Sequence, residues 1–280
     1  MEKNIKKQPI LSCIIIFSIC GIARLTEYFF IRTDETFFSE NFLHKVLGII
    51  VLTIVLYLLH SSWRGIGFLK EEMVSGVVKG FVLGSGCFVI AYSIECLILY
   101  LINRNVSLSF YVSGFSLNGE PEKHTGILFL ILCIVFNIVN VWMEEGVFRG
   151  LFMKILTEKL SFISAVLLIA FLFGIWHWVM PLRDYMEGNT PLTGLLVMGI
   201  GYIILAGIMS IKWSLLYKMT GTLWVELGDH LFNNVIVTNL LHVVSNNEAD
   251  SMQIVRILIG QMLSFTIVML YYKNVIKIVK

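Results

Sequence analysis

Two glutamates and an arginine stand inside a long apolar run, at Glu144, Glu145 and Arg149. An ionised side chain in hydrocarbon costs on the order of 3 kcal/mol even on the mildest scale, so such groups must pair or line a hydrated cavity. On a helix, Glu145 and Arg149 lie four positions apart and can pair, whereas Glu144 points about 100° away from Glu145. The spacing therefore predicts an ion pair beside one glutamate that is free for chemistry.

Two later apolar runs each contribute a histidine. His177 follows Phe173 by four positions, and Glu226, His230 and Asn234 recur at intervals of four, on one face of a helix. A seam of interhelical hydrogen bonds is the structural alternative for such a face. Together these groups supply a carboxylate to deprotonate water, an imidazole to share the proton and a His/Asn pair to stabilise an oxyanion. That set of groups is suited to amide hydrolysis.

The elements that carry these residues have the composition of membrane helices. The chain is 57% hydrophobic and 14% charged, with a mean hydropathy of +0.83, whereas soluble domains are about a quarter charged. Eight stretches reach the ~20 apolar residues of a membrane span, and their unbroken runs disfavour a β-barrel. They are residues 10–30, 42–59, 74–102, 127–151, 160–179, 192–216, 223–241 and 254–275. We predict an all-α, polytopic membrane helix bundle of about eight transmembrane helices.

The sequence contains no linker that would divide it. We expect one transmembrane domain over residues 1–280, with a motif-bearing catalytic core at about 127–243. The longest connection, residues 103–125, holds Gly114, Gly119 and Pro121 and is predicted to be a loop. A net charge of +2 without a basic stripe argues against nucleic acid as a partner.

Lysine and arginine counts predict the orientation in the membrane. Alternate connections collect thirteen basic residues on one side, among them Lys212 and Lys218 at the end of the sixth run, and six on the other. The positive-inside rule then places both termini in the cytoplasm. The first run could instead be a signal peptide that is cleaved near Ala23. A retained helix is simpler, because Arg24 and Glu27 lie three positions apart and can neutralise each other.

Three motifs occur in order on three of these runs: Glu144-Glu145-x-x-x-Arg149, Phe173-x-x-x-His177 and His230-x-x-x-Asn234. This order resembles the CPBP family, which covers CAAX prenyl endopeptidases and bacteriocin-processing or immunity (Abi-type) membrane proteases. The resemblance spans about residues 142–234 and implies an intramembrane endopeptidase. It implies that Glu144 activates water with His177 assisting, and that His230 and Asn234 form the oxyanion site. Glu145 and Arg149 would support this arrangement.

The same resemblance leaves the role of metal open, since the family has been described both as metal-dependent and as a metal-free glutamyl protease. Zinc could find Glu144, His177 and His230, a His₂/carboxylate set with open coordination. The His230/Asn234 spacing is not HExxH, however, and Asn is a poor zinc ligand. We therefore favour a metal-free enzyme without a cofactor, with a peptide or lipidated protein as substrate. The compact length favours a bacterial cell membrane.

Two other classes of function remain open at this point. A non-catalytic immunity protein could bind a peptide bacteriocin in the same cavity. A proton-coupled transporter could use Glu95, Glu144 and Glu226 as a relay, although Glu95 lies outside the motifs and could simply be a paired acid. The span boundaries also place His177 and His230 near opposite ends of their helices, which a shared site would have to reconcile.

Overall fold

The computed structural model describes the backbone of residues 2–113 and 123–279, and the side chains of residues 5–113 and 123–274. All eight stretches predicted to be helical contain a helix, so the predicted all-α membrane bundle is confirmed. These helices are α2 (Pro9–Thr26), α3 (Leu43–Leu58), α4 (Met73–Leu101), α5 (Ile127–Glu144), α7 (Phe162–Trp176), α9 (Leu192–Thr220), α10 (Trp224–Phe232) and α11 (Gln253–Val279).

Six helical segments of the described chain are long and apolar enough to cross a membrane. They are Pro9–Glu35, Lys70–Leu101, Ile127–Leu156, Phe162–Met186, Leu192–Thr220 and Gln253–Asn274. The other two predicted spans are shorter: α3 has 16 residues, and α10 has nine before it continues as the π-helix η6 (Asn233–Leu240). The predicted number of about eight spans is therefore approximate.

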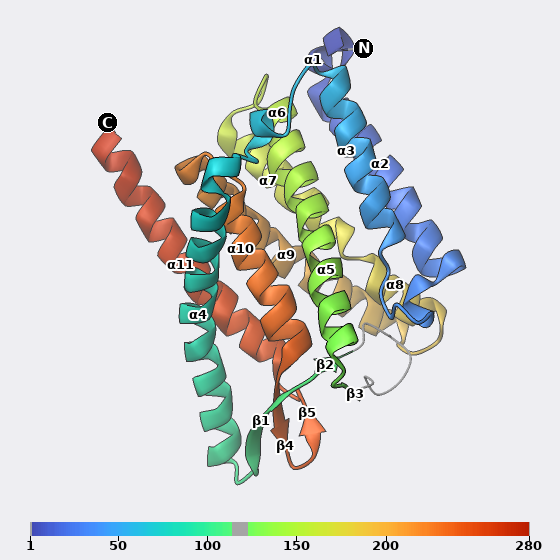
Figure 1. The fold of residues 1–280 in the computed structure, drawn as a ribbon, viewed down its shortest axis with the longest axis vertical. Coiled ribbons are helices and arrows are strands. Elements are labelled where there is room, and N and C mark those ends of the chain that lie inside the picture. Colours follow the sequence, from blue (N-terminus) through green and yellow to red (C-terminus); the bar gives the residue numbers. More distant parts are fainter. Residues whose placement is uncertain (1, 114–122, 280) are drawn as a thin grey trace.

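Several shorter helices extend or connect these elements. The π-helix η5 (Glu145–Phe152) and then α6 (Met153–Leu156) continue α5, and α8 (Val179–Met186) follows α7. The remaining short helices are α1 (Glu2–Lys7), η1 (Glu27–Ile31), η2 (Thr33–Glu35), η3 (Arg64–Ile66) and η4 (Lys70–Glu72). Figure 1 shows α1 and the last turns of α11 at one end of the bundle. The β-strands lie at the opposite end.

Short strands replace much of the loop predicted at residues 103–125, which is a correction. Strand β1 (Val106–Phe110) pairs antiparallel with β4 (Leu241–Ser245), in the register Val106 opposite Ser245, and β4 pairs with β5 (Glu248–Ala249). Strands β2 (Val112–Ser113) and β3 (Lys123–His124) form a second pair. The strand β1 reads Val-Ser-Leu-Ser-Phe, an alternating pattern typical of a strand with two different faces. Gly114, Gly119 and Pro121 lie outside the described residues.

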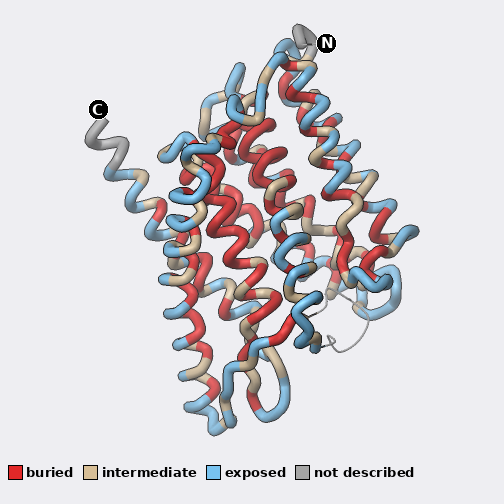
Figure 2. The backbone as a smooth tube through the Cα atoms, in the orientation of Figure 1, coloured by how far each residue is buried: buried red, intermediate tan, exposed pale blue. Residues whose placement is uncertain are grey.

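The centre of the bundle holds the helices that carry the polar motifs. Figure 2 shows buried backbone along the middle of the bundle and exposed stretches on the outer helices. Every residue of α10 and of η5 is buried. The outer helices instead present large apolar side chains outward, as Val82 and Leu196 do, which suits a lipid environment.

Glycines let α10 lie directly against α4. A Cβ at Gly80 of α4 would collide with backbone atoms of Val225 and Asp229 in α10, and a Cβ at Gly228 would collide with the backbone of Val77. Small residues at helix contacts allow this close approach in membrane bundles. Gly76 and Gly84, one turn to either side of Gly80, also face α10. The contact fixes the position of the helix that carries His230.

Lys212 does not mark a helix end, contrary to the sequence prediction. Helix α9 continues to Thr220, and the Lys212 ammonium is buried, where it donates to Asp229 (2.5 Å), Gln261 (2.7 Å) and Ser264 (2.9 Å). A basic residue can lie in the bundle when carboxylate and hydroxyl acceptors surround it. Lys212 therefore links α9, α10 and α11 and should not be counted in the positive-inside argument.

Candidate functional site

Glu144 is the last residue of α5, and its two carboxylate oxygens have different surroundings. The side chain is 2% exposed. Its Oε1 accepts a hydrogen bond from Trp176 Nε1 at 2.9 Å and lies 4.0 Å from Arg24 Nη1. Its Oε2 has no hydrogen-bond partner among the described residues. Because a buried carboxylate oxygen normally accepts hydrogen bonds, Oε2 is the atom available to a water molecule or a substrate.

His230 lies between the two glutamates. Its Nδ1 is 2.7 Å from Glu145 Oε1, its Nε2 is 3.6 Å from Glu144 Oε2, and its ring stacks on Trp213 with centroids 4.1 Å apart. An ionised Glu145 can only accept, so Nδ1 carries the proton and Nε2 faces Glu144. The stacking and the hydrogen bond together fix the orientation of the imidazole.

The ion pair predicted between Glu145 and Arg149 is present. Arg149 Nε is 3.0 Å from Glu145 Oε2, and neither side chain is exposed. The guanidinium carbon lies 4.1 Å from the centroid of the Phe173 ring and 4.8 Å from that of Trp213. These aromatic faces compensate in part for the loss of water around the cation. Glu145 therefore contacts both Arg149 and His230, whereas Glu144 takes no part in the ion pair with Arg149.

His177 caps the C-terminal end of α7 and lies at the edge of the site. Its Nδ1 is 2.8 Å from the carbonyl oxygen of Phe173, which can only accept, so Nδ1 carries the proton and Nε2 is left as an acceptor. The half-buried ring interacts electrostatically with Glu144, but no direct hydrogen bond joins them in the described chain. The rings of His177 and His230 lie 4.7 and 6.4 Å from that of Phe173.

The helix boundaries explain how the two histidines approach each other. The apolar segment around His177 extends through α8 to Met186, so this residue lies near the middle of its span instead of near an end. His230 likewise lies inside the combined length of α10 and η6. The predicted run 160–179 ended too close to His177, whereas the predicted run 223–241 around His230 nearly matches the observed helices.

Asn234 makes no contact with the other predicted catalytic groups among the interactions found in the described residues. Its Oδ1 accepts a hydrogen bond from Asn233 (3.1 Å), and its carbonyl oxygen accepts one from Asn239 (2.7 Å). The π-helix begins at Asn233, and its wider turn changes the face reached four residues after His230. The half-buried Asn234 is therefore less closely associated with His230 than α-helical spacing predicts.

Two side chains of the site were missed by the sequence reasoning. Trp176, next to His177, donates to Glu144, and Arg24 comes from α2. Arg24 had been paired with Glu27, but the Glu27 carboxylate is 2.6 Å from His44 Nδ1 and also accepts from Thr33. Three-residue spacing indicated a local pair for Arg24, whereas its observed carboxylate neighbour lies on another helix.

The other acids near the motifs differ in their surroundings. Asp229 accepts from Lys212 and from Trp213 Nε1 (2.8 Å), which accounts for it as a structural group. Glu226 is fully buried, and neither of its oxygens has a hydrogen-bond partner among the described residues. It interacts electrostatically with Glu145 and Arg149. Glu226 therefore belongs to the charged environment of the site without a hydrogen-bonding role of its own.

The donor groups do not form a zinc site. Zinc needs three or four ligands that converge at about 2 Å. Among the side chains that the structure describes, no three His, Cys, Asp or Glu residues are arranged to hold a metal ion. The set Glu144, His177 and His230 thus does not fit zinc, and we derive no step through a metal.

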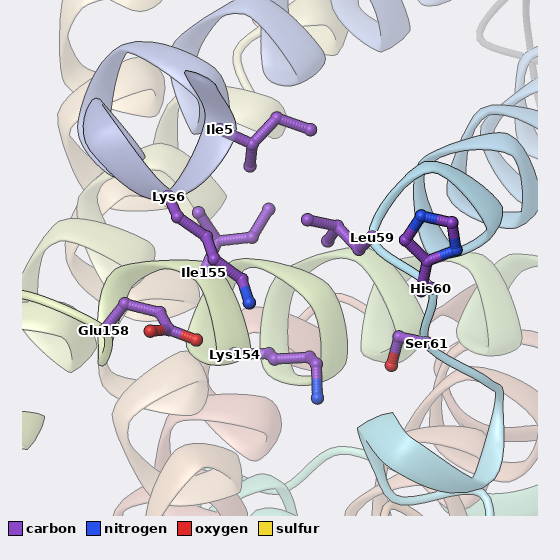
Figure 3. A pocket seen from close by; sticks show the side chains of 8 residues that line it. All are labelled: Ile5, Lys6, Leu59, His60, Ser61, Lys154, Ile155 and Glu158. Atoms are coloured by element: carbon purple, nitrogen blue, oxygen red, sulfur yellow. The ribbon is translucent and has the colours of Figure 1, made fainter. Parts of the chain in front are cut away.

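A separate cleft of about 150 Å³ lies between the end of α1, the residues after α3 and α6. Figure 3 shows its lining, which includes Lys6, His60, Lys154 and Glu158. None of the motif residues contributes to it. This cleft is therefore distinct from the buried site around Glu144.

The fold and the site define a multi-pass membrane protein with carboxylates and histidines gathered inside its helix bundle. Residues 126–236 match the family model of Type II CAAX prenyl endopeptidase Rce1-like. The chain is also 25% identical over 237 residues to "Putative membrane peptidase YdiL" of Bacillus subtilis (strain 168), covering 81% of this chain and 84% of that protein. No solved structure matches the chain. These findings confirm the resemblance carried by the three motifs and support a membrane protease of the CAAX type.

Proposed function

We propose that the protein is an intramembrane endopeptidase of the glutamyl type, in which Glu144 activates the attacking water. The observation that carries this proposal is the position of Glu144 Oε2, a buried carboxylate oxygen without a hydrogen-bond partner in the described chain, 3.6 Å from His230 Nε2. A water held by both atoms would be oriented for deprotonation and shielded from bulk solvent.

The residues then have the following roles. Glu144 takes a proton from water as the water oxygen attacks the scissile carbonyl, and it returns the proton to the leaving amine. His230 in its doubly protonated form donates from Nε2 to the developing oxyanion, and Glu145 at 2.7 Å stabilises that imidazolium. His177 assists at Glu144 through its free Nε2. Asn234 has its Oδ1 engaged by Asn233, which leaves its amide NH₂ as a second donor to the oxyanion.

The substrate is proposed to be a peptide or a lipid-anchored protein tail near the bilayer. We expect the protein in a bacterial cell membrane with both termini in the cytoplasm. Purified protein in detergent would be offered a farnesylated peptide ending in a Cys-aliphatic-aliphatic-X sequence and the same peptide without the lipid. Mass spectrometry of peptides from cells with wild-type protein or with Glu144→Gln would search for other substrates.

The decisive variant is Glu144→Gln, which keeps the shape of the side chain and removes the base. We expect at least about a 10²-fold loss of kcat, since general-base catalysis contributes 10²- to 10⁴-fold. Glu158→Gln is the control, because Glu158 is exposed and lies in the separate cleft. A metal chelator should leave cleavage unchanged. Wild-type rates in Glu144→Gln would contradict the mechanism, and protection from a bacteriocin that survives this substitution would favour the non-catalytic immunity function.

A further inference from the structure

Arg24 is a buried cation that lies outside the matched residues 126–236 yet reaches the proposed site. Its side chain is 8% exposed. The guanidinium carbon lies 4.4 Å from the centroid of the Trp176 ring and 5.3 Å from that of Tyr28. Aromatic faces stabilise a desolvated cation only in part, so a buried arginine needs a negative charge nearby.

The nearest acid along the chain does not supply that charge. The Glu27 carboxylate accepts hydrogen bonds from the backbone amides of Leu43 (2.9 Å) and His44 (2.6 Å), in addition to the contact with the His44 ring. Arg24 Nε and Nη1 have no hydrogen-bond partner in the described chain, and Nη1 lies 4.0 Å from Glu144 Oε1. That separation is too long for a hydrogen bond, but at low dielectric it gives a substantial charge interaction.

Trp176 connects the two charged groups. One face of its indole carries the Arg24 guanidinium, and its Nε1 donates to the same oxygen, Glu144 Oε1. Both neighbours therefore stabilise negative charge on Oε1 and fix its direction. The other oxygen, Oε2, is left toward His230.

We propose that Arg24 is a positioning residue of the peptidase site, which keeps Glu144 ionised and directs its free oxygen Oε2 toward the water. This inference rests on the proposed function. It also makes α2 part of the site, which requires that the first helix is retained.

Other charged groups surround Glu144, and each must be considered in a pH-dependent test. They are Glu145 and Arg149 on η5, His177 after α7, and Glu226 and His230 on α10, while His44 on α3 packs against Trp176. Arg149 is paired with Glu145, and each histidine carries a charge only when both of its ring nitrogens are protonated. Arg24 is a permanent cation at Oε1, and an opposite charge at this range favours an ionised carboxyl by 1 to 3 pH units.

The test measures kcat/KM for peptide cleavage against pH in wild-type, Arg24→Gln and Arg24→Lys proteins. Because Arg24 favours the ionised base, Arg24→Gln should move the acid limb upward by about 1 pH unit. Activity should then fall about 10-fold below that limb and stay near wild type above it. Arg24→Lys retains the charge and should retain the limb. Arg256→Gln removes an equally buried cation outside the site and should not move it.

Two outcomes would overturn the proposal. An equal loss of activity at every pH would indicate a role in folding alone. A loss confined to peptides with a free C-terminal carboxylate, with the corresponding amides unaffected, would make Arg24 a substrate ligand. If Arg24→Gln does not fold, Trp176→Phe replaces it as the test, since it keeps the ring and removes the donor to Oε1, and it should move the limb in the same direction.

A second measurement does not require cleavage. Isotope-edited infrared difference spectra with ¹³C-labelled glutamate, compared with Glu144→Gln, follow the protonation of this one carboxyl. A midpoint that moves upward in Arg24→Gln supports the proposal even if the wild-type protein cleaves no peptide, in which case only the proposed function fails. An unmoved midpoint in an active enzyme refutes the role of Arg24 and leaves the function intact.

Discussion

Replacing Glu145 by glutamine should reduce both the stability and the activity of the protein, for separate reasons. Glu145 is fully buried and contacts Arg149 Nε at 3.0 Å and His230 Nδ1 at 2.7 Å. The substitution keeps the shape and removes the charge, so Arg149 loses its closest counterion. Breaking a buried pair in this way costs about 3–5 kcal/mol. We expect the lower end, about 3 kcal/mol, because Glu226 also interacts with Arg149.

The effect on activity comes from His230. A glutamine carries no charge, so it cannot stabilise the imidazolium form of His230 that donates from Nε2 to the oxyanion. Removing one hydrogen-bond donor to an oxyanion lowers kcat by about 10²- to 10³-fold. The charge is lost even where the glutamine oxygen still accepts from Nδ1, so we expect a loss of kcat between about 10²- and 10³-fold.

The double variant Glu145→Gln/Arg149→Met separates the two effects. Replacing both charges by groups of similar volume is often neutral or stabilising, so most of the lost stability should return. The activity should not return, because His230 still lacks its carboxylate. Thermal unfolding in detergent can be followed with a thiol-reactive dye, since Cys13, Cys20, Cys87 and Cys133 are buried in the folded protein. A double variant as unstable as the single one, or one that regains activity, would refute this reasoning.

Two further predictions concern the scaffold. Gly80→Val should lower the melting temperature and the activity together, because a Cβ at Gly80 meets the backbone of α10. Gly86→Val on the same helix is the control and should change little, since a Cβ at Gly86 has nothing within 4 Å. Burial acts to raise the pKa of Asp250, but hydrogen bonds from His242 and Arg256 outweigh it and hold that pKa below its ordinary value of 3.8. Because this folded-state pKa is depressed, Asp250 contributes stability that is present above pH 3.8 and lost at lower pH. Between pH 3 and 6, the free energy of unfolding of Asp250→Asn should therefore fall less steeply toward acid pH than that of the wild type. An equally steep fall would contradict the assignment.

Local pattern predicted the helices and one ion pair well. Apolar runs of about 20 residues identified all eight helical stretches, since in a bilayer each backbone polar group must be satisfied within its own segment. The four-residue spacing of Glu145 and Arg149 predicted their contact, because both residues lie on consecutive turns of one helix. The alternation in β1 and the glycine spacing around Gly80 are also local patterns in the sequence, and they correspond to a strand and to the contact between α4 and α10.

Contacts between helices could not be obtained from spacing. Arg24 and Glu27 could neutralise each other locally, but tertiary packing gives each a different partner, Glu144 and His44. The sequence predicted Lys212 to lie at a membrane interface, but in the structure it pairs with Asp229 on α10. The π-helix that displaces Asn234 also depends on packing, since no rule of local propensity predicts where the turn widens.

Buried polar atoms that lack a hydrogen bond are concentrated around the candidate site. Among the described residues, 18 buried side-chain nitrogen and oxygen atoms lack a hydrogen bond, and nine of them belong to Arg24, Glu144, Glu145, Arg149 and Glu226, although two of the nine, Arg149 Nε and Glu145 Oε2, form an ion pair at 3.0 Å. Buried polar atoms are normally paired, so these atoms are the ones that water or polar groups of a substrate would satisfy. A proton relay through Glu95 finds less support, because Glu95 is 2.8 Å from Arg256, whose other carboxylate partner is Asp250 next to the β-strands. These contacts lead away from Glu144, which favours hydrolysis at an enclosed site over transport along the bundle.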